Sequence, residues 1–221
     1  MVLLASASAL YFLTICILPQ ENGQNVPRAI LEIDSALQDT AETNFLLKFK
    51  VLTEARVVAV VNASNSFQLD KMLDKIRSLS SVEITSEPLM DCETFARSLE
   101  ISMELSKQAG KPLQRQNLFW VDINIEYTGK TTQEFLQLWK RDLEFVMGAK
   151  NQGALAIEAF KVLAQRKVKT FVSFPLPDME HTIEFGTPMY QENGNNVRMV
   201  CKRIEFLDDY VSKIKNESKQ A

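Results

Sequence analysis

The sequence Phe-Lys-Val-Leu occurs twice in this chain of 221 residues, at residues 49–52 and at residues 160–163. In both places a short polar turn and a second β-rich segment follow, which is the pattern of a β-hairpin. An internal repeat constrains the fold strongly, because each copy has to form the same supersecondary unit. The sequence therefore predicts a chain built from two similar halves.

The segments around the hairpin extend the repeat. Residues 10–17 align with residues 118–125 ahead of the hairpin, and residues 95–99 align with residues 210–214 behind it. The alternating and helical periodicities between these landmarks predict the element order β-α-β-β-α-β in each half, with a closing helix. The expected fold class is therefore α+β, with two tandem ferredoxin-like (βαββαβ) repeats.

A polar segment that contains a glycine and a proline separates the two halves. Segments of this composition lack an apolar period and form loops or linkers. We expect a first ferredoxin-like repeat at residues 1–105, a linker at 106–116 and a second repeat at 117–221.

Within the first half, the apolar spacing predicts a helix over residues 27–42 and a closing helix over residues 93–105. A strand over residues 82–87 is expected to stop at Pro88, because proline cannot donate a ladder hydrogen bond. In the second half, a helix over residues 131–151 is expected to be capped by Thr132.

Two further helices are predicted in the second half. A short one is expected near residues 178–185 and a closing one over residues 206–214, on either side of a turn at 192–195.

The charge and the cysteines exclude several classes of protein. A net charge of −3 provides no positive field for a phosphate backbone, so nucleic acid is not an expected partner. Cys16, Cys92 and Cys201 lie far apart and lack the spacing of zinc ligands. Glycine-rich phosphate loops and the motifs of serine hydrolases and zinc proteases are also missing from the sequence. We therefore expect no metal and no cofactor.

The apolar residues 3–18 have two interpretations, a secretory signal or the first strand of the first repeat. No lysine or arginine precedes the run, and its alignment with residues 118–125 favours the strand. We expect a cytoplasmic protein, and a secreted one is the alternative if residues 1–18 are a signal peptide. The run is short for a membrane span, so no membrane partner is expected.

Several short motifs follow one another in the order of a known family. The first half has Gln-Leu-Asp-Lys-Met-Leu at 68–73 and Glu-Pro-Leu at 87–89. The second half has Trp-Lys-Arg-Asp-Leu-Glu at 139–144 and Pro-Met-Tyr-Gln-Glu-Asn-Gly at 188–194. With these motifs the chain resembles muconolactone isomerase-like proteins. It departs from them at 179–182, where Met-Glu-His-Thr replaces the leucine-aspartate pair.

The resemblance implies a dimeric α+β barrel, in which two four-stranded antiparallel sheets normally come from two subunits. Here one chain would supply both sheets, as an internal pseudo-dimer that is a monomer or forms homo-oligomers. The namesakes of the family move a double bond within a lactone by proton transfer, without a metal or a cofactor. The resemblance thus implies a small-molecule protein, and an isomerase if it is an enzyme.

One polar face of a predicted strand is the first candidate site. Because side chains alternate along a strand, Trp120, Asp122 and Asn124 share a face. A carboxylate in an apolar pocket has a raised pKa that suits proton abstraction, so Asp122 is the candidate general base. The alternative is that Asp122 is exposed or paired with Lys169 or Arg198 on neighbouring strands.

The single histidine, His181, is the second candidate for acid–base catalysis, because its ordinary pKa lies near neutrality. A solvated surface position beside two acidic residues is the alternative. Tyr190 could polarise a carbonyl group or simply pack at the mouth of the barrel. The predicted substrate-binding residues are Trp120, Asn124, Lys169, Tyr190 and Arg198.

Two hypotheses about function follow. In the first, the protein binds a small organic molecule, acidic or a lactone, between its two sheets and isomerises it without a cofactor. In the second, the same barrel is a non-catalytic binding or assembly module.

Overall fold

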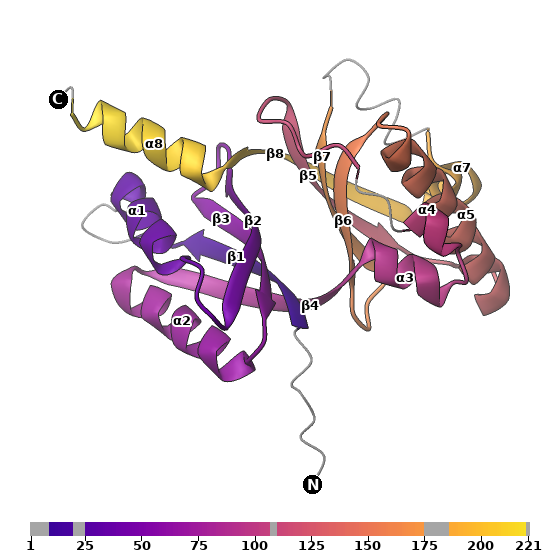
Figure 1. Cartoon of the computed structure of the whole chain (residues 1–221), viewed down its shortest axis with the longest axis horizontal. Helices are drawn as coiled ribbons and strands as arrows, with labels where there is room; N and C mark the ends of the chain where they lie inside the picture. Colours follow the sequence, from indigo (N-terminus) through magenta and orange to yellow (C-terminus); the bar gives the residue numbers. More distant parts are fainter. Residues whose placement is uncertain (1–8, 20–24, 107–109, 175–185, 220–221) are drawn as a thin grey trace, which may run out of the picture. The chain divides into compact units, whose positions relative to one another are not determined.

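The computed structural model describes residues 9–19, 25–106, 110–174 and 186–219. The chain divides into two compact units, one made of Met1–Leu89 with Ile204–Ala221 and the other of Met90–Arg203. The chain leaves the first unit near the end of strand β4 (Val82–Asp91) and returns to it within strand β8 (Val197–Phe206), as Figure 1 shows. Each unit combines an antiparallel sheet with helices on one of its faces.

The sheet of the first unit has the strand order β4-β1-β3-β2, and the last residues of β8 pair with the end of β2. Strand β3 is central, and Val57 to Val61 within it are fully buried. A run that is apolar at every position is typical of a strand covered on both faces. The bounds are Ala9–Ile17 for β1, Thr43–Val51 for β2 and Arg56–Ala63 for β3.

Three helices cover one face of this sheet: α1 (Val26–Ala36), α2 (Ser66–Leu79) and α8 (Leu207–Glu217), as Figure 1 shows. Their buried residues form one core with the inward side chains of β1 and β3. Asparagine side chains cap the first two helices, since Asn25 Oδ1 accepts from Arg28 N at 2.9 Å and Asn65 Oδ1 from Phe67 N at 3.0 Å.

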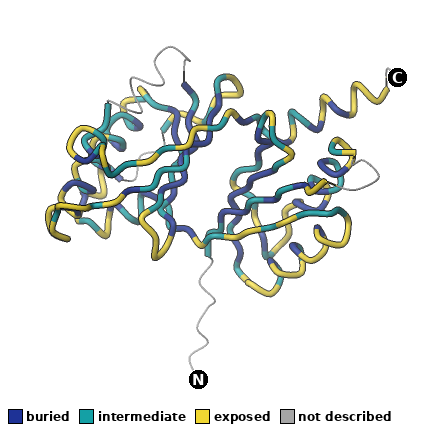
Figure 2. The backbone as a smooth tube through the Cα atoms, turned by 180° about the vertical axis from the view of Figure 1, so that it is seen from behind, coloured by how far each residue is buried: buried dark blue, intermediate teal, exposed yellow. Residues whose placement is uncertain are grey.

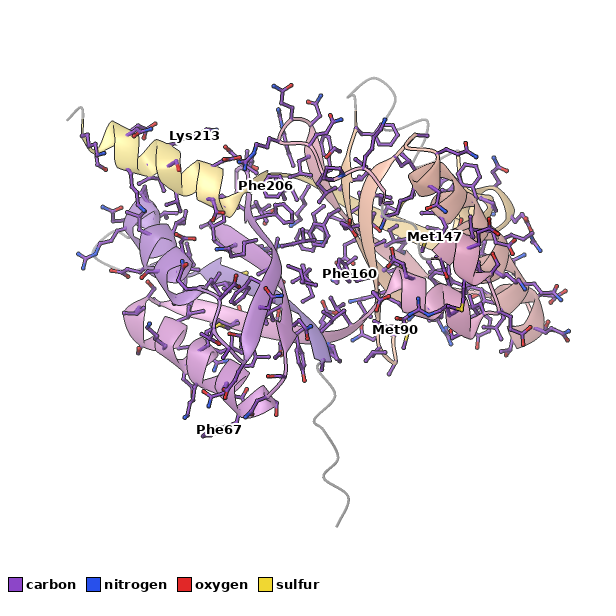
Figure 3. The ribbon with its side chains drawn as sticks, in the orientation of Figure 1. Phe67, Met90, Met147, Phe160, Phe206 and Lys213 are labelled. Carbon is purple, nitrogen blue, oxygen red and sulfur yellow. The ribbon has the colours of Figure 1, made fainter. Side chains whose placement is uncertain are left out.

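Helix α8 belongs to the first unit although it follows the second unit in the sequence. Leu207, Val211 and Ile214 are buried in the core of the first unit. Phe206, which is labelled in Figure 3, lies just before the helix. Its ring packs on that of Phe49 with 5.0 Å between ring centres. The predicted repeat boundaries, 1–105 and 117–221, thus differ from the division into compact units and remain a prediction about the repeat.

The sheet of the second unit has the corresponding strand order, β8-β5-β7-β6. Its other strands are β5 (Leu118–Ile125), β6 (Ala156–Val162) and β7 (Lys167–Ser173). The helices of the unit are α3 (Cys92–Ser98), α4 (Met103–Ser106), α5 (Thr132–Asn151) and α7 (Pro188–Asn193), followed by the 3₁₀ helix η1 (Gly194–Asn196).

Helix α5 is the longest helix of the second unit's described residues, and it packs on the sheet. Phe135, Leu138, Trp139, Leu143 and Met147 point inward and are buried; Figure 3 labels Met147. The predicted helix is confirmed, but its cap is Thr131 and not Thr132. Thr131 Oγ1 accepts from Glu134 N at 3.2 Å and Glu134 Oε2 accepts from Thr131 N at 2.7 Å, which is a capping box.

The hydrogen-bonded strands follow one another in the order β1-β3-β2-β8-β5-β7-β6-β4, and β4 pairs with β1, which closes the barrel. The chain is therefore α+β with an eight-stranded antiparallel barrel. In each unit the strands carry most of the buried backbone, and the outward faces of the helices are exposed, as Figure 2 shows. The strand predicted at residues 10–17 is confirmed as β1, which pairs with β3 and β4.

Two predicted boundaries in the first half are wrong, the end of the first helix and the end of the strand at Pro88. Helix α1 ends at Ala36 and not at residue 42, because side chains bond the following turn: Asp39 Oδ1 accepts from Phe45 N at 2.7 Å, and Thr40 Oγ1 from Thr43 N at 3.0 Å. Strand β4 continues through Pro88, opposite Tyr11, to Asp91. Proline is tolerated where no ladder donor is needed.

The closing helix predicted at residues 93–105 is broken in two. Helix α3 ends at Ser98, and Glu100 has a left-handed backbone with φ of 60°, so α4 starts anew at Met103. In the second half, α7 and η1 replace the turn expected at 192–195. The helix expected near 178–185 lies outside the described residues.

The repeated Phe-Lys-Val-Leu sequence has the same structure in both units. Lys50 Nζ donates to Val51 O at 2.5 Å and to Glu54 O, and Lys161 Nζ donates to Val162 O at 2.8 Å and to Gln165 O. Each lysine thus satisfies two carbonyl groups of its own hairpin turn. The lysine of the repeated sequence therefore stabilises the hairpin turn in each unit.

None of the helices described here is long and apolar enough to cross a membrane.

Candidate functional site

The second unit contains a cavity of about 120 Å³ between its sheet and the helices that cover it. The wall is almost entirely aliphatic and aromatic. The strands and the residues next to their ends provide Val121, Ile123, Ile125, Leu155, Ile157, Ala159, Val168, Thr170, Val172, Phe174, Val197 and Met199. The helices and their flanks provide Cys92, Trp139, Asp142, Leu143, Phe145, Val146, Thr187, Met189 and Tyr190.

Asp142 is the one carboxylate in the wall of this cavity as far as the chain is described. It lies on α5 and is partly buried. Asp142 Oδ1 accepts a hydrogen bond from Met189 N at 2.9 Å, and the carboxylate also bonds the side chain of Thr187. Burial raises the pKa of Asp142 from 3.8 to about 6, although these two hydrogen bonds oppose the rise.

Helix α7 lines the cavity beside α5 and is held by two neighbouring residues of α5. Asp142 bonds its first turn, and Arg141 Nη2 lies 2.5 Å from Glu192 Oε2. The two contacts fix Met189 and Tyr190 against the cavity. The Asp142 carboxylate therefore has two roles: it is part of the cavity wall, and it holds helix α7 in position.

Cys92 on α3 supplies a second ionisable group to the wall. Its thiol is buried, and burial raises the pKa of Cys92, so the thiol stays protonated. The wall of the cavity therefore contains a neutral thiol as well as the Asp142 carboxylate.

Sequence reasoning missed Asp142 as a site residue. Its signal was present, because Leu138, Asp142 and Val146 follow one another at helical spacing, so the carboxylate falls in the apolar stripe of the helix. An acidic side chain is rarely buried among apolar core residues unless it forms a hydrogen bond or an ion pair. The site predicted from the sequence was instead the polar face of strand β5, with Asp122.

The predicted strip on β5 points away from this cavity. Val121, Ile123 and Ile125 face the cavity, and the alternating Asp122 lies on the other face of the sheet, as does Trp120. Asp122 Oδ2 accepts from Lys169 Nζ at 2.9 Å, and the two residues are direct partners across β5 and β7. The alternative in which Asp122 pairs with Lys169 is therefore the arrangement observed.

The structure brings most of the other predicted residues to this same face. Lys169 Nζ lies 5.7 Å from the ring centre of Trp120, and Asn124 is the direct partner of Arg198 across β5 and β8. Lys169 is 3% exposed. The roles of Asp122 as a base and of these residues in substrate binding remain predictions.

Tyr190 and His181 fall elsewhere. Tyr190 lies on α7 and lines the cavity, so it is the predicted residue that shares the cavity wall with Asp142. His181 lies outside the described residues. Among the residues that are described, no three His, Cys, Asp or Glu side chains are grouped as metal ligands would be.

Comparison with protein-family models gives no match for this chain, and comparison with curated proteins gives none either. Solved structures of chlorite dismutase from Candidatus Nitrospira defluvii are similar to it. An arginine-to-alanine variant has a TM-score of 0.59 and 11% identity over 95% of each chain. An arginine-to-lysine variant has a TM-score of 0.60 and 9% identity over 94% of this chain and 96% of its own.

The same chlorite dismutase in complex with imidazole has a TM-score of 0.57 and 12% identity over 95% of each chain. At these identities the likeness shows the fold alone, an α+β barrel of the chlorite dismutase-like kind. These structures do not support the muconolactone isomerase-like family in particular.

Proposed function

We propose that the second unit binds a small, mainly apolar organic molecule in the cavity between its sheet and helices α5 and α7. The observation that carries the proposal is a cavity of about 120 Å³ with an apolar wall and one carboxylate, Asp142. Small-molecule sites typically combine an apolar lining with a few placed polar groups. A chlorite dismutase of this fold in complex with imidazole gives further support, since a small ring binds to that protein.

The size of the cavity limits the ligand. A cavity of about 150 Å³ lined by aliphatic and aromatic side chains accommodates benzene. The cavity described here is slightly smaller, about 120 Å³. The ligand is therefore a single small ring or a short branched chain.

Filling the cavity tests this function. Ala159 lies on β6 in the wall, and Ala159→Leu would occupy part of the space. Toluene, followed by saturation-transfer NMR, should bind the natural protein and lose most of its affinity for Ala159→Leu. Ala154→Leu is the matched control, because Ala154 is exposed just before β6. Equal binding by all three proteins would exclude the cavity as the site.

A second candidate is cofactor-independent proton transfer, the activity that the muconolactone isomerase-like resemblance implies. The pKa of Asp142, raised to about 6, favours it, because a general base works best with a pKa near the working pH. The base would take a proton from the carbon beside a lactone carbonyl and return it at the far end of the double bond. Asp122 remains the base predicted from the sequence.

A β,γ-unsaturated lactone, α-angelica lactone, tests this activity and separates the two carboxylates. Loss of its conversion to the conjugated isomer in Asp142→Asn alone would assign the reaction to the cavity. Loss in Asp122→Asn alone would assign it to the opposite face of the sheet. No conversion by the natural protein would favour the non-catalytic binding module.

The finer fold proposal is that each half of the chain, residues 1–105 and 117–221, is one ferredoxin-like repeat, which makes the chain an internal pseudo-dimer. The corresponding strand orders, β4-β1-β3-β2 and β8-β5-β7-β6, support it. The cytoplasmic location, the monomeric or homo-oligomeric state and a ligand between the two sheets remain predictions.

A further inference from the structure

Asp142 is an anion in the cavity wall without a cation beside it among the described residues. The described wall contains no lysine or arginine. The cations next to Asp142 on α5 are engaged elsewhere: Arg141 pairs with Glu192 at 2.5 Å, and Lys140 Nζ donates to Glu100 O at 3.4 Å. A carboxylate that loses water without gaining a cation is costly to ionise.

Among the residues that the structure describes, the other polar groups around Asp142 do not supply a positive charge. The Met189 amide and the Thr187 hydroxyl are neutral donors, the Cys92 thiol on α3 stays protonated, and Tyr190 lines the wall from α7. The strands contribute aliphatic and aromatic side chains with the one hydroxyl of Thr170. The site is thus negative at one point and apolar elsewhere.

We infer that the ligand of this cavity is a small organic amine, whose ammonium group pairs with the Asp142 carboxylate while its hydrocarbon body fills the apolar space. The inference rests on the proposed function and specifies its ligand. A cationic group on the ligand would offset the cost of ionising the partly buried carboxylate. Hydrogen bonds between an ammonium group and a carboxylate are charge-assisted and are stronger than those between neutral groups. A carboxylate ligand would instead meet a like charge.

The raised pKa of Asp142 agrees with this reading of the geometry. The causes of the shift are burial and two hydrogen bonds from neutral donors, and no cation among the described residues lowers the pKa. An ammonium group placed beside the carboxylate would return its pKa towards the ordinary range.

Three probes of nearly equal size test the inference: cyclohexylamine, cyclohexanol and cyclohexanecarboxylate, titrated calorimetrically at about pH 7.5, where Asp142 is ionised. We expect the amine to bind about tenfold or more tightly than the alcohol, and the carboxylate not to bind. Asp142→Asn should reduce the affinity for the amine to that for the alcohol and leave the alcohol within about twofold.

Glu144→Gln is the matched control, since it removes one negative charge from the same helix outside the cavity wall. It should leave the preference for the amine unchanged. Thermal unfolding of each variant verifies that the second unit is folded. Because the asparagine keeps an oxygen acceptor for Met189 N, Asp142→Asn should retain helix α7 in place.

The outcomes separate the inference from the proposed function. Equal binding of the amine and the alcohol would overturn the amine while the cavity remains a binding site. Preference for the carboxylate, or an amine preference that survives Asp142→Asn, would also overturn it. Binding of none of the three probes, together with no binding of toluene, would overturn the proposed function itself.

Discussion

Lys50 Nζ lies 5.2 Å from the centre of the Tyr210 ring, and the equivalent Lys161 Nζ lies 5.9 Å from the centre of the Phe95 ring. Tyr210 lies on α8 and Phe95 on α3, the helices that close the two units. The same lysine thus bonds its hairpin turn and contacts the closing helix in each unit. The repeated Phe-Lys-Val-Leu sequence is explained by these contacts.

Replacing either lysine by methionine should destabilise its unit. Lys161→Met leaves the carbonyl groups of Val162 and Gln165 without their donor, and the loss of these two bonds, one part-buried and one exposed, costs about 0.5–1.5 kcal/mol. Urea unfolding measures the change, and Lys50→Met should have a similar effect. Lys71→Met is the control, since Lys71 lies 4.5 Å from the exposed Phe67 ring and its loss should cost less than about 0.5 kcal/mol.

Asp142→Asn should stabilise the protein without ligand at neutral pH. The folded-state pKa of Asp142 is raised from 3.8 to about 6, so the folded protein binds more protons than the unfolded chain between these values. Its stability should therefore rise as the pH falls from about 7 to about 4. We expect the asparagine to add about 1–2 kcal/mol at pH 7 and to remove that part of the pH dependence. A drop in stability at pH 7 would contradict this sign.

Binding of cyclohexylamine should weaken in acid if Asp142 provides the negative charge. With a pKa of about 6, the carboxylate is mostly ionised at pH 7.5 and about one-tenth ionised at pH 5. We expect the affinity for the amine to fall about tenfold between these values, while that for cyclohexanol changes little. Calorimetric titration of both probes at each pH measures the difference. Parallel loss for both probes would point to partial unfolding instead.

Lys169→Met should destabilise the second unit by about 2–4 kcal/mol, because Asp122 would remain partly buried without its cation. Lys169→Met combined with Asp122→Leu should recover most of this loss, since both charges are then removed. A double variant as unstable as the single one would indicate that Lys169 acts mainly through other contacts. Denaturant unfolding of the single and double variants measures the coupling.

Local patterns predicted most of the secondary structure. The periodicity of residues 131–151 predicted α5, and the hairpins around residues 49–62 and 160–174 were found where expected. The errors occur where side chains compete with the backbone, as at Asp39 and Thr40 after α1, or where one residue adopts a left-handed conformation, as at Glu100. The residue at which a helix ends depends on individual hydrogen bonds and backbone conformations, which the periodicity of apolar residues does not reveal.

The candidate site was predicted less well, because the sequence states what alternates along a strand but not which face a ligand can reach. Asp122 and its neighbours were correctly grouped on one face, and the ion pair with Lys169 was among the alternatives. Asp142 was overlooked, since a helix stripe is normally core. Asp142 lines a cavity because α5 and α7 do not fill all the space above the sheet. How these elements pack is decided by the tertiary structure and not by the local sequence.

The sequence by itself determined the two hairpins, the apolar faces of the helices and the repeated element order, because these follow from local periodicity and turn chemistry. Tertiary structure alone decided that α8 completes the first unit and that α3 and α4 join the second. It also decided that one carboxylate lines an apolar cavity. Helices with apolar stripes can cover any sheet face that they reach, so their partners are chosen by packing between distant segments of the chain.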